Sequence, residues 1–238
     1  MKAKTMILLA AAIAAATVLA APTGRSARRG AKAAAADEGG SAANARDMKI
    51  IVEQPPRTGS SCCLGAPSLQ GATMVGQCYN KPRSWIVVET KYKTFAKFID
   101  QLTFTWHVVL ETKSAKENKG NVMKLAPYSY FNTSVTYFNI PQGSHAACVC
   151  LPPSYLELYG EPKAIGFEIT NANGEVLGGD TVSDIKAIKA HTKFWEMDNF
   201  KEAMEGENPN IVRRQGLLDR SKTIRALVNP NDYEATMQ

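Results

Sequence analysis

The sequence has little of what enzymes and metalloproteins use for their chemistry. Its three histidines, His107, His145 and His191, lie far apart in the chain. Structural zinc sites usually take closely spaced pairs of cysteine or histidine, and no such grouping is present. The serine-containing loops lack the G-x-S-x-G motif of a nucleophile elbow, and no spacing brings together the two carboxylates of a glycosidase. We therefore predict no catalytic residue, no metal and no cofactor, and expect each histidine at the surface or in a capping position.

Positive charge is also nearly absent from most of the chain. The formal net charge is +6, but residues 1–46 hold seven basic and two acidic side chains, which is 7 − 2 = +5. The other 192 residues therefore carry 6 − 5 = +1. A nearly neutral body lacks the electrostatic footprint of a nucleic-acid-binding protein, so no nucleic-acid partner is predicted. The basic cluster Arg25–Lys32 is expected in a solvated tail, with contact to anionic lipid or cell-wall polymer as the alternative.

The N-terminal segment has the pattern of an export signal. Lys2 and Lys4 precede the apolar run Met6–Ala20, whose last residues suit a signal peptidase. The run is alanine-rich and shorter than the roughly 20 residues that a spanning helix needs. We predict a signal peptide over 1–21 and a flexible basic Ala/Gly/Arg linker over 22–47, with a retained anchor as the alternative. The protein is expected at the cell surface, in the periplasm or outside the cell, with no transmembrane segment after cleavage.

Cysteine is present in an odd number, five residues that would all remain after export: Cys62, Cys63, Cys78, Cys148 and Cys150. Export to an oxidising compartment permits disulfides, and an odd number of cysteines leaves at least one thiol free or paired between chains. We expect one bridge, either between the Cys62/Cys63 loop and Cys78 or from Cys78 to the strand that carries Cys148 and Cys150. The alternative is that all five are small buried side chains in a reduced protein.

The clearest pattern of the chain is the alternation of apolar and polar residues over Phe98–Glu111. Leu102, Phe104, Trp106, Val108 and Leu110 share one face of an extended strand. A strand with one dry face needs an opposing sheet, so Trp106 is predicted to anchor the core. Further strands are expected at Met48–Glu53, Ala72–Tyr79, Ser84–Tyr92, Val122–Leu125, Ser134–Ile140 and His145–Leu151.

The C-terminal third contains a hairpin signal followed by helical patterns. Asn173-Gly174 separates the predicted strands Ala164–Thr170 and Glu175–Leu177, which favours a type I′ turn. A final strand is expected over Ile185–Trp195, and helices over Asp198–Glu207, capped by Asp198, and over 217–228. The fold class is thus mainly β. We predict an immunoglobulin-like β-sandwich of about seven or eight strands over 48–195 and a C-terminal helical extension over 196–238.

Aromatic residues are concentrated between two of these strands. Tyr128, Tyr130, Phe131 and Tyr137 fall within ten positions. If exposed, Tyr128, Tyr130 and Tyr137 are candidates for stacking on sugar rings, and the alternative is that they fill the edge of the sandwich.

The layout of the whole chain resembles a known family. It combines an export signal, a basic linker, strands from Met48-Lys49-Ile50-Ile51-Val52 to the Ala164–Leu177 hairpin, and a short helical tail. This layout is similar to that of secreted immunoglobulin-like proteins associated with type IV pilus-like assemblies in mucin-degrading gut bacteria. The resemblance implies a non-enzymatic surface or periplasmic component that acts in structure or adhesion, with protein partners at the cell surface or in the pilus assembly and the capacity to form homo-oligomers. A carbohydrate-binding module for host or mucin glycans is the alternative function, and an exported enzyme is the third.

Overall fold

The computed structural model describes residues 48–66, 83–112, 126–205, 209–228 and 235–236. All of these belong to one compact unit, Ser41–Gln238. The predicted signal peptide and linker lie outside the described residues, and so do the predicted strands Ala72–Tyr79 and Val122–Leu125.

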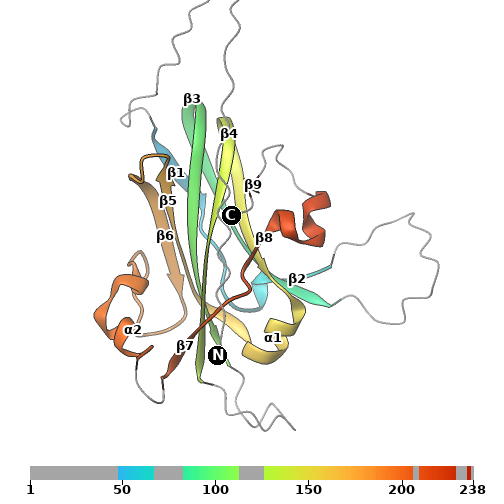
Figure 1. The fold of residues 1–238 in the computed structure, drawn as a ribbon, viewed down its shortest axis with the longest axis vertical. Coiled ribbons are helices and arrows are strands. Elements are labelled where there is room, and N and C mark those ends of the chain that lie inside the picture. Colours follow the sequence, from blue (N-terminus) through green and yellow to red (C-terminus); the bar gives the residue numbers. More distant parts are fainter. Residues whose placement is uncertain (1–47, 67–82, 113–125, 206–208, 229–234, 237–238) are drawn as a thin grey trace, which may run out of the picture. The chain divides into compact units, whose positions relative to one another are not determined.

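The described strands form one sheet of nine strands (Figure 1). Its central path is β6-β5-β3-β4-β7, with β1 and β2 also paired to β3, and β8 and β9 to β4. All pairs are antiparallel except β4 with β7. The strands are β1 (Ile50–Gln54), β2 (Cys63–Gly65), β3 (Ser84–Glu111), β4 (Tyr128–Leu151), β5 (Glu161–Asn171), β6 (Val176–Ser183), β7 (Ile211–Arg214), β8 (Leu218–Asp219) and β9 (Ala235–Thr236). Two short helices, α1 (Pro153–Tyr159) and α2 (Asp198–Glu202), and four 3-10 turns complete the described elements.

Strand β3 folds back on itself, and its partner β4 follows it. Twelve residues of straight strand would span about 40 Å, yet the ring centroids of Tyr92 and Phe104 are 4.9 Å apart. In β4, the backbone N–H of Cys148 donates to the hydroxyl oxygen of Tyr137 at 3.3 Å. Figure 1 shows both strands running to one end of the unit and returning. One long hairpin therefore supplies strands to both layers of the fold.

The bend is set by an irregular pairing and a polar cluster. Thr94 pairs with Gly143 and Phe98 with Pro141, so β3 has three residues where β4 has one. The Thr94 hydroxyl donates to the Pro141 carbonyl at 2.9 Å and accepts from the Gly143 N–H at 3.2 Å. The φ of Gly143 is +141°, a conformation that strongly favours glycine. His145 lies 3.1 Å from the Thr94 hydroxyl through Nε2, which makes it part of the bend instead of a surface histidine.

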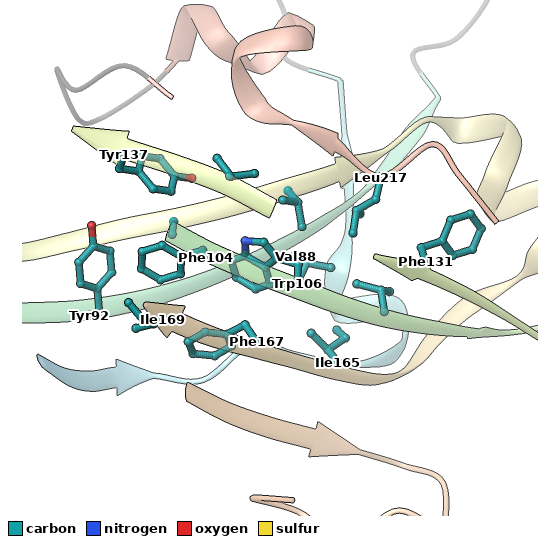
Figure 2. Packing of buried hydrophobic residues seen from close by; sticks show 14 of the residues in the cluster. Val88, Tyr92, Phe104, Trp106, Phe131, Tyr137, Ile165, Phe167, Ile169 and Leu217 are labelled. Carbon is teal, nitrogen blue, oxygen red and sulfur yellow. The ribbon is translucent and has the colours of Figure 1, made fainter. Parts of the chain in front are cut away.

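The core lies between the two layers and is rich in aromatic rings (Figure 2). Trp106 is fully buried, 5.1 Å from Phe167 of β5 and 6.2 Å from Phe104 between ring centroids. Tyr92 and Val88, from the first half of β3, close the other side of the core (Figure 2). The inward residues of both halves of β3 thus pack on each other, as the faces of two stacked sheets do.

The predicted fold class is confirmed: the protein is mainly β and consistent with a β-sandwich. The predicted strands Ser84–Tyr92 and Phe98–Glu111 are two parts of the continuous β3, and Ser134–Ile140 and His145–Leu151 are two parts of β4. Sequence periodicity separated them because the bend interrupts the alternation of buried residues.

The predicted hairpin between β5 and β6 is confirmed, but the predicted type I′ turn is wrong. The Asn171 N–H donates to the Glu175 carbonyl at 3.0 Å, and Gly174 has a φ of +80°. Asn173 does not have the positive φ that a type I′ turn requires. The turn is stabilised instead by the side-chain oxygen of Asn171, which accepts from the N–H groups of Asn173 and Glu175, each at 2.9 Å.

The expectation of a helical extension over 196–238 is wrong. In the described part of this range, strands β7, β8 and β9 pair with β4 and extend the sheet. Helix α2 has only five residues, and Asp198 is its first residue, after the N-cap Met197. The predicted second helix is replaced by β8 and 3-10 turns, and the predicted strand Ile185–Trp195 consists of turns and a 3-10 segment.

Replacing Trp106 should destabilise the whole unit. In Trp106→Ala, the lost burial and the cavity between the layers should lower the free energy of unfolding by about 3–5 kcal/mol. Chemical denaturation followed by circular dichroism measures the loss. The matched control is Trp85→Ala, because Trp85 is only partly buried at the edge of a small cluster. An equal loss in both variants would show that the core does not depend on Trp106.

Candidate functional site

A polar pocket lies beside β6, the end strand of the central path. Among the described strands, β6 pairs only with β5. The pocket has a volume of about 210 Å³. Its walls come from β5, from β6 and from the segment between Lys189 and Trp195, and its ionisable lining residues are Glu168, Asp180, His191 and Lys193. We call this the β6 pocket.

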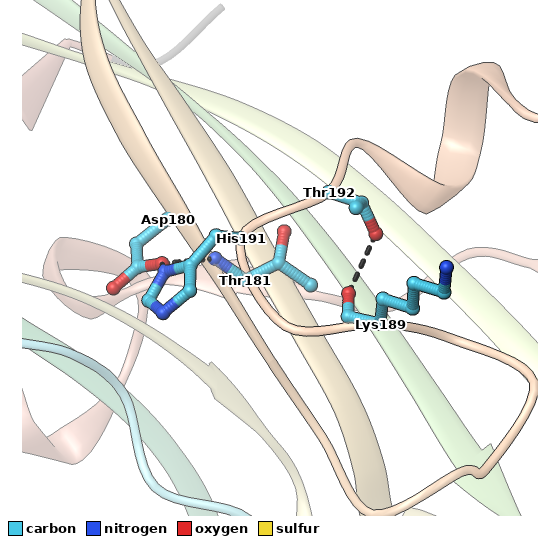
Figure 3. Close-up of polar contacts among 5 residues, drawn as sticks. All are labelled: Asp180, Thr181, Lys189, His191 and Thr192. Carbon is cyan, nitrogen blue, oxygen red and sulfur yellow. Dashed lines mark hydrogen bonds and ion pairs between the residues drawn. The ribbon is translucent and has the colours of Figure 1, made fainter.

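One rim of the β6 pocket is held by His191 (Figure 3). Its Nδ1 lies 2.6 Å from Oδ1 of Asp180, and its backbone N–H donates to the Thr181 carbonyl at 3.0 Å. The same Asp180 oxygen accepts from the Thr181 N–H at 2.7 Å. His191 has a φ of +59°, an uncommon conformation for a residue with a side chain, and these contacts hold it there. Because the His191 side chain is 79% exposed, it presents an imidazole to solvent at a fixed position.

The second rim is formed by a lysine between two carboxylates. Lys193 donates to Glu168, and its Nζ lies 3.6 Å from Glu196. The hydrogen bond to Glu168 raises the pKa of Lys193 above its ordinary value, so the amine stays charged. The hydrogen-bonded pair of His191 with Asp180 and the ion pair of Lys193 with Glu168 therefore hold an imidazole, an amine and two carboxylates around one opening.

Trp195 connects the β6 pocket to the sheet below it. Its ring lines the pocket and stacks on the imidazole of His107, with centroids 4.0 Å apart and planes 4° from parallel. Gly166 of β5 makes this position available. A Cβ added there would lie 2.3 Å from the Trp195 ring and 2.9 Å from the Thr181 hydroxyl. The absence of a side chain at 166 thus fixes where the tryptophan lies.

Beneath Trp195 is a buried polar pair that the sequence pattern does not reveal. His107 Nδ1 lies 2.6 Å from the Tyr130 hydroxyl, and both side chains are buried. Burial lowers the pKa of His107 to about 4 and raises the pKa of Tyr130 to about 12. Both groups are therefore neutral at pH 7. The expectation of a surface histidine at 107 is wrong because the segment carrying Phe194 and Phe200 covers this face of the sheet.

The arrangement suits binding better than chemistry. The carboxylates of Glu168 and Asp180 are each engaged by a basic side chain, and the His107–Tyr130 pair is shielded from the pocket by Trp195. Within the described ranges, no group of three or more histidine, cysteine, aspartate or glutamate side chains could hold a metal ion. A ligand would meet a flat aromatic surface, oriented charges of both signs and exposed glycine backbone at Gly179.

The predicted glycan-contact tyrosines are not brought together. Tyr130 and Tyr137 are both 5% exposed and lie on opposite faces of β4, in two different apolar clusters. Tyr128 is partly buried beside the cluster that contains Tyr130. Stacking of sugars on Tyr130 and Tyr137 is therefore wrong as a prediction, because both faces of this part of β4 are covered.

No disulfide joins any two of the described cysteines. Cys148 and Cys150 carry free thiols on one face of β4, so the predicted bridge from Cys78 to this strand is wrong. The contact between the two thiols raises the pKa of Cys148 and lowers the pKa of Cys150. Cys62 is buried with a free thiol whose pKa is raised to about 12 by burial, Cys63 begins β2, and Cys78 lies outside the described residues.

The fold is that of a mainly β domain with a polar pocket beside β6. A protein-family model matches residues 64–234, most of the chain, so the protein belongs to that family. The fold is similar to a crystal structure of a protein from Akkermansia muciniphila, a mucin-degrading gut bacterium, with a TM-score of 0.54 and 19% sequence identity. That match covers 80% of this chain and 94% of the other. No curated protein matches the sequence. Among the described residues, no helix is long and apolar enough to cross a membrane.

The buried histidine should make stability depend on pH. Because the pKa of His107 is about 4 in the folded protein and ordinarily 6.5, the unfolded chain binds more protons between these values. The contribution of the neutral His107 to the free energy of unfolding is fully present above pH 6.5. It is lost as the pH falls toward 4, and the loss is up to about 3 kcal/mol. Denaturant unfolding at about pH 7 and about pH 4.5 measures the difference.

The control for this pH dependence is His107→Gln, which can still hydrogen-bond Tyr130 but does not titrate. The other ionisable groups are the same in both proteins, so their share of the pH dependence of stability cancels in the comparison. An identical pH dependence in the two proteins would contradict a neutral, buried His107.

Adding a methyl group at position 166 should displace Trp195. In Gly166→Ala, the new Cβ overlaps the indole, so we expect a loss of about 1–3 kcal/mol in unfolding free energy and a red-shifted tryptophan emission. Gly178→Ala is the control, since its Cβ would meet only Ile169 at 4.0 Å. Unchanged emission in Gly166→Ala would show that Trp195 does not depend on the glycine.

Proposed function

We propose that this protein is an exported, non-enzymatic component of the bacterial cell surface or periplasm, and that it serves in structure or adhesion within a pilus-like assembly. The β6 pocket is its contact site for protein partners, including further copies of the chain. The observation that carries the proposal is a pair of polar contacts beside an end strand: the hydrogen bond of His191 with Asp180 and the ion pair of Lys193 with Glu168.

Three features support contact as the mode of action. The charged rims are held in position before any partner arrives, which lowers the ordering cost of association. An end strand can pair with a strand of another chain, and paired charges beside it select partners and register. The family is not a known enzyme family. The predicted export signal and the resemblance of the layout to that of pilus-associated immunoglobulin-like proteins support the proposed location.

The proposal is tested with purified protein and with pilus-type filaments sheared from the host bacterium. Asp180→Asn combined with Lys193→Ala removes one charge from each rim, and we expect binding to the filaments to weaken at least about tenfold. The control combines Asp198→Asn with Lys201→Ala, the same changes on exposed residues of α2. Surface plasmon resonance measures both.

Location is tested separately by protease treatment of intact cells that express the tagged chain. The proposal requires cleavage in intact cells or release with the periplasmic fraction. Retention in the cytoplasm, or turnover of a substrate that disappears on substitution of one pocket residue, would contradict it.

Glycan binding is a second candidate, and one observation favours it. Trp195 lines the β6 pocket together with the carboxylates of Glu168 and Asp180, a combination that can stack on a sugar ring and bind its hydroxyl groups. Binding of mucin O-glycans that is lost in Trp195→Ala and retained in Trp85→Ala would support it. Absence of binding to a mucin-glycan array would remove this candidate.

A further inference from the structure

Exposed apolar and basic side chains gather at the bend of β3, and none of them lines the β6 pocket. The residues belong to β3, to β1 and to the chain just before β1. We call them the bend patch: Lys49, Ile51, Lys93, Phe95, Lys97 and Phe98.

The sheet register places four of these residues side by side on its outer face. Ile51 pairs with Lys93 and Ile50 with Thr94, and Lys49 and Phe95 each follow one residue beyond the second pair, so all four share a face. The amines of Lys49 and Lys93 lie 5.8 Å and 5.7 Å from the centre of the Phe95 ring. The two lysines thus flank an aromatic ring that is itself open to solvent.

The apolar members of the bend patch are unusually exposed for side chains of their size. Ile51 is 40% exposed, Phe95 41% and Phe98 49%. These three are among only seven large apolar side chains that are so exposed in the described part of the chain. Clustered exposure of this kind marks an interaction surface.

The electrostatics select an anionic partner. Between Lys91 and Phe98 there are three lysines and no acidic residue, and all three amines are on exposed side chains. The nearest acidic residue on β1, Glu53, already accepts a hydrogen bond from Ser144 at 3.1 Å. Asp100 is the acidic residue on the far side of the bend. The patch itself therefore has a net positive charge.

The chemistry of the apolar side chains favours a lipid surface over an anionic glycan as the partner of the bend patch. Phenylalanine and isoleucine cannot hydrogen-bond sugar hydroxyls, whereas they gain free energy by entering the boundary of the acyl chains. Lysine stems lie along such a boundary and keep their amines at the level of the phosphates. We propose that the bend patch docks the domain on the surface of an anionic lipid bilayer, with Phe95 and Phe98 inserted and the lysines on the headgroup phosphates.

The place of the patch in the chain supports this orientation. Lys49 is the second described residue, so the 47 residues before Met48 join the domain directly at the patch. Those residues contain the apolar run Met6–Ala20 and the cluster Arg25–Lys32. The basic cluster therefore precedes the bend patch by fewer than 20 residues along the chain.

The test uses the full chain and vesicles of phosphatidylglycerol and phosphatidylcholine in equal parts. Since Arg25–Lys32 is present in every variant, differences in vesicle binding between variants arise from the bend patch. We expect Phe95→Ala with Phe98→Ala to weaken co-sedimentation at least about tenfold, and Lys93→Glu with Lys97→Glu to weaken it further as well as reduce its salt dependence. Leu158→Ala is the matched control, because Leu158 of α1 is 40% exposed and lies outside the patch.

Insertion is measured directly with Phe98→Trp. The emission of the added indole should shift to the blue with these vesicles and be quenched by brominated acyl chains, while the emission of Leu158→Trp should not change. The proposal is overturned by equal binding of the double alanine variant, by unquenched emission in the Phe98→Trp variant, or by equal binding to pure phosphatidylcholine. Tight binding to heparin without binding to the vesicles would assign the patch to an anionic glycan instead. Filament binding through the β6 pocket is measured on the same variants and should not change, so failure of either proposal is distinguishable.

Discussion

The fold depends on the bend shared by β3 and β4. Two stacked sheets are normally built from separate strands, whereas here one hairpin of very long strands crosses from one layer to the other. The constraint that makes this possible is local: Thr94 satisfies backbone groups of Pro141 and Gly143 where the regular ladder is broken. With those groups satisfied, the inward side chains of both halves of β3 can pack around Trp106 without leaving buried backbone groups unpaired at the bend.

The same constraint explains which parts of the fold the sequence could predict. Period-two alternation identified the second half of β3, the middle of β4 and β5. The first half of β3 was identified by its β-branched residues, the end of β4 by its apolar run and the β5–β6 hairpin by Asn173-Gly174. These patterns could not show that pairs of predicted strands were continuous, since the bend shifts the alternation. The residues after 195 were assigned to helices because Phe200, Ala203 and Met204 have helical spacing. In the structure that spacing is realised only as the short helix α2, Asp198–Glu202. Strands β7 to β9, which pair with β4 further along the chain, are too short for periodicity to reveal.

The candidate site was less predictable than the fold. His107 was placed on a polar face because it alternates with threonines, and nothing in the sequence indicated that residues 194–200 would cover it. The β6 pocket joins Glu168 to Lys193 and Asp180 to His191, pairs that are 25 and 11 residues apart and have no motif. A positive φ at His191 is a tertiary property.

The contact between Gly166 and Trp195 also constrains how this family can vary. A small residue in the middle of β5 is tolerable only because the indole fills the space above it, and the indole fits only because the residue is small. Neither position can change alone without leaving a void or an overlap. Descendants of this fold should therefore inherit the two residues together, or exchange both at once for a larger side chain on the strand and a smaller one in the covering segment.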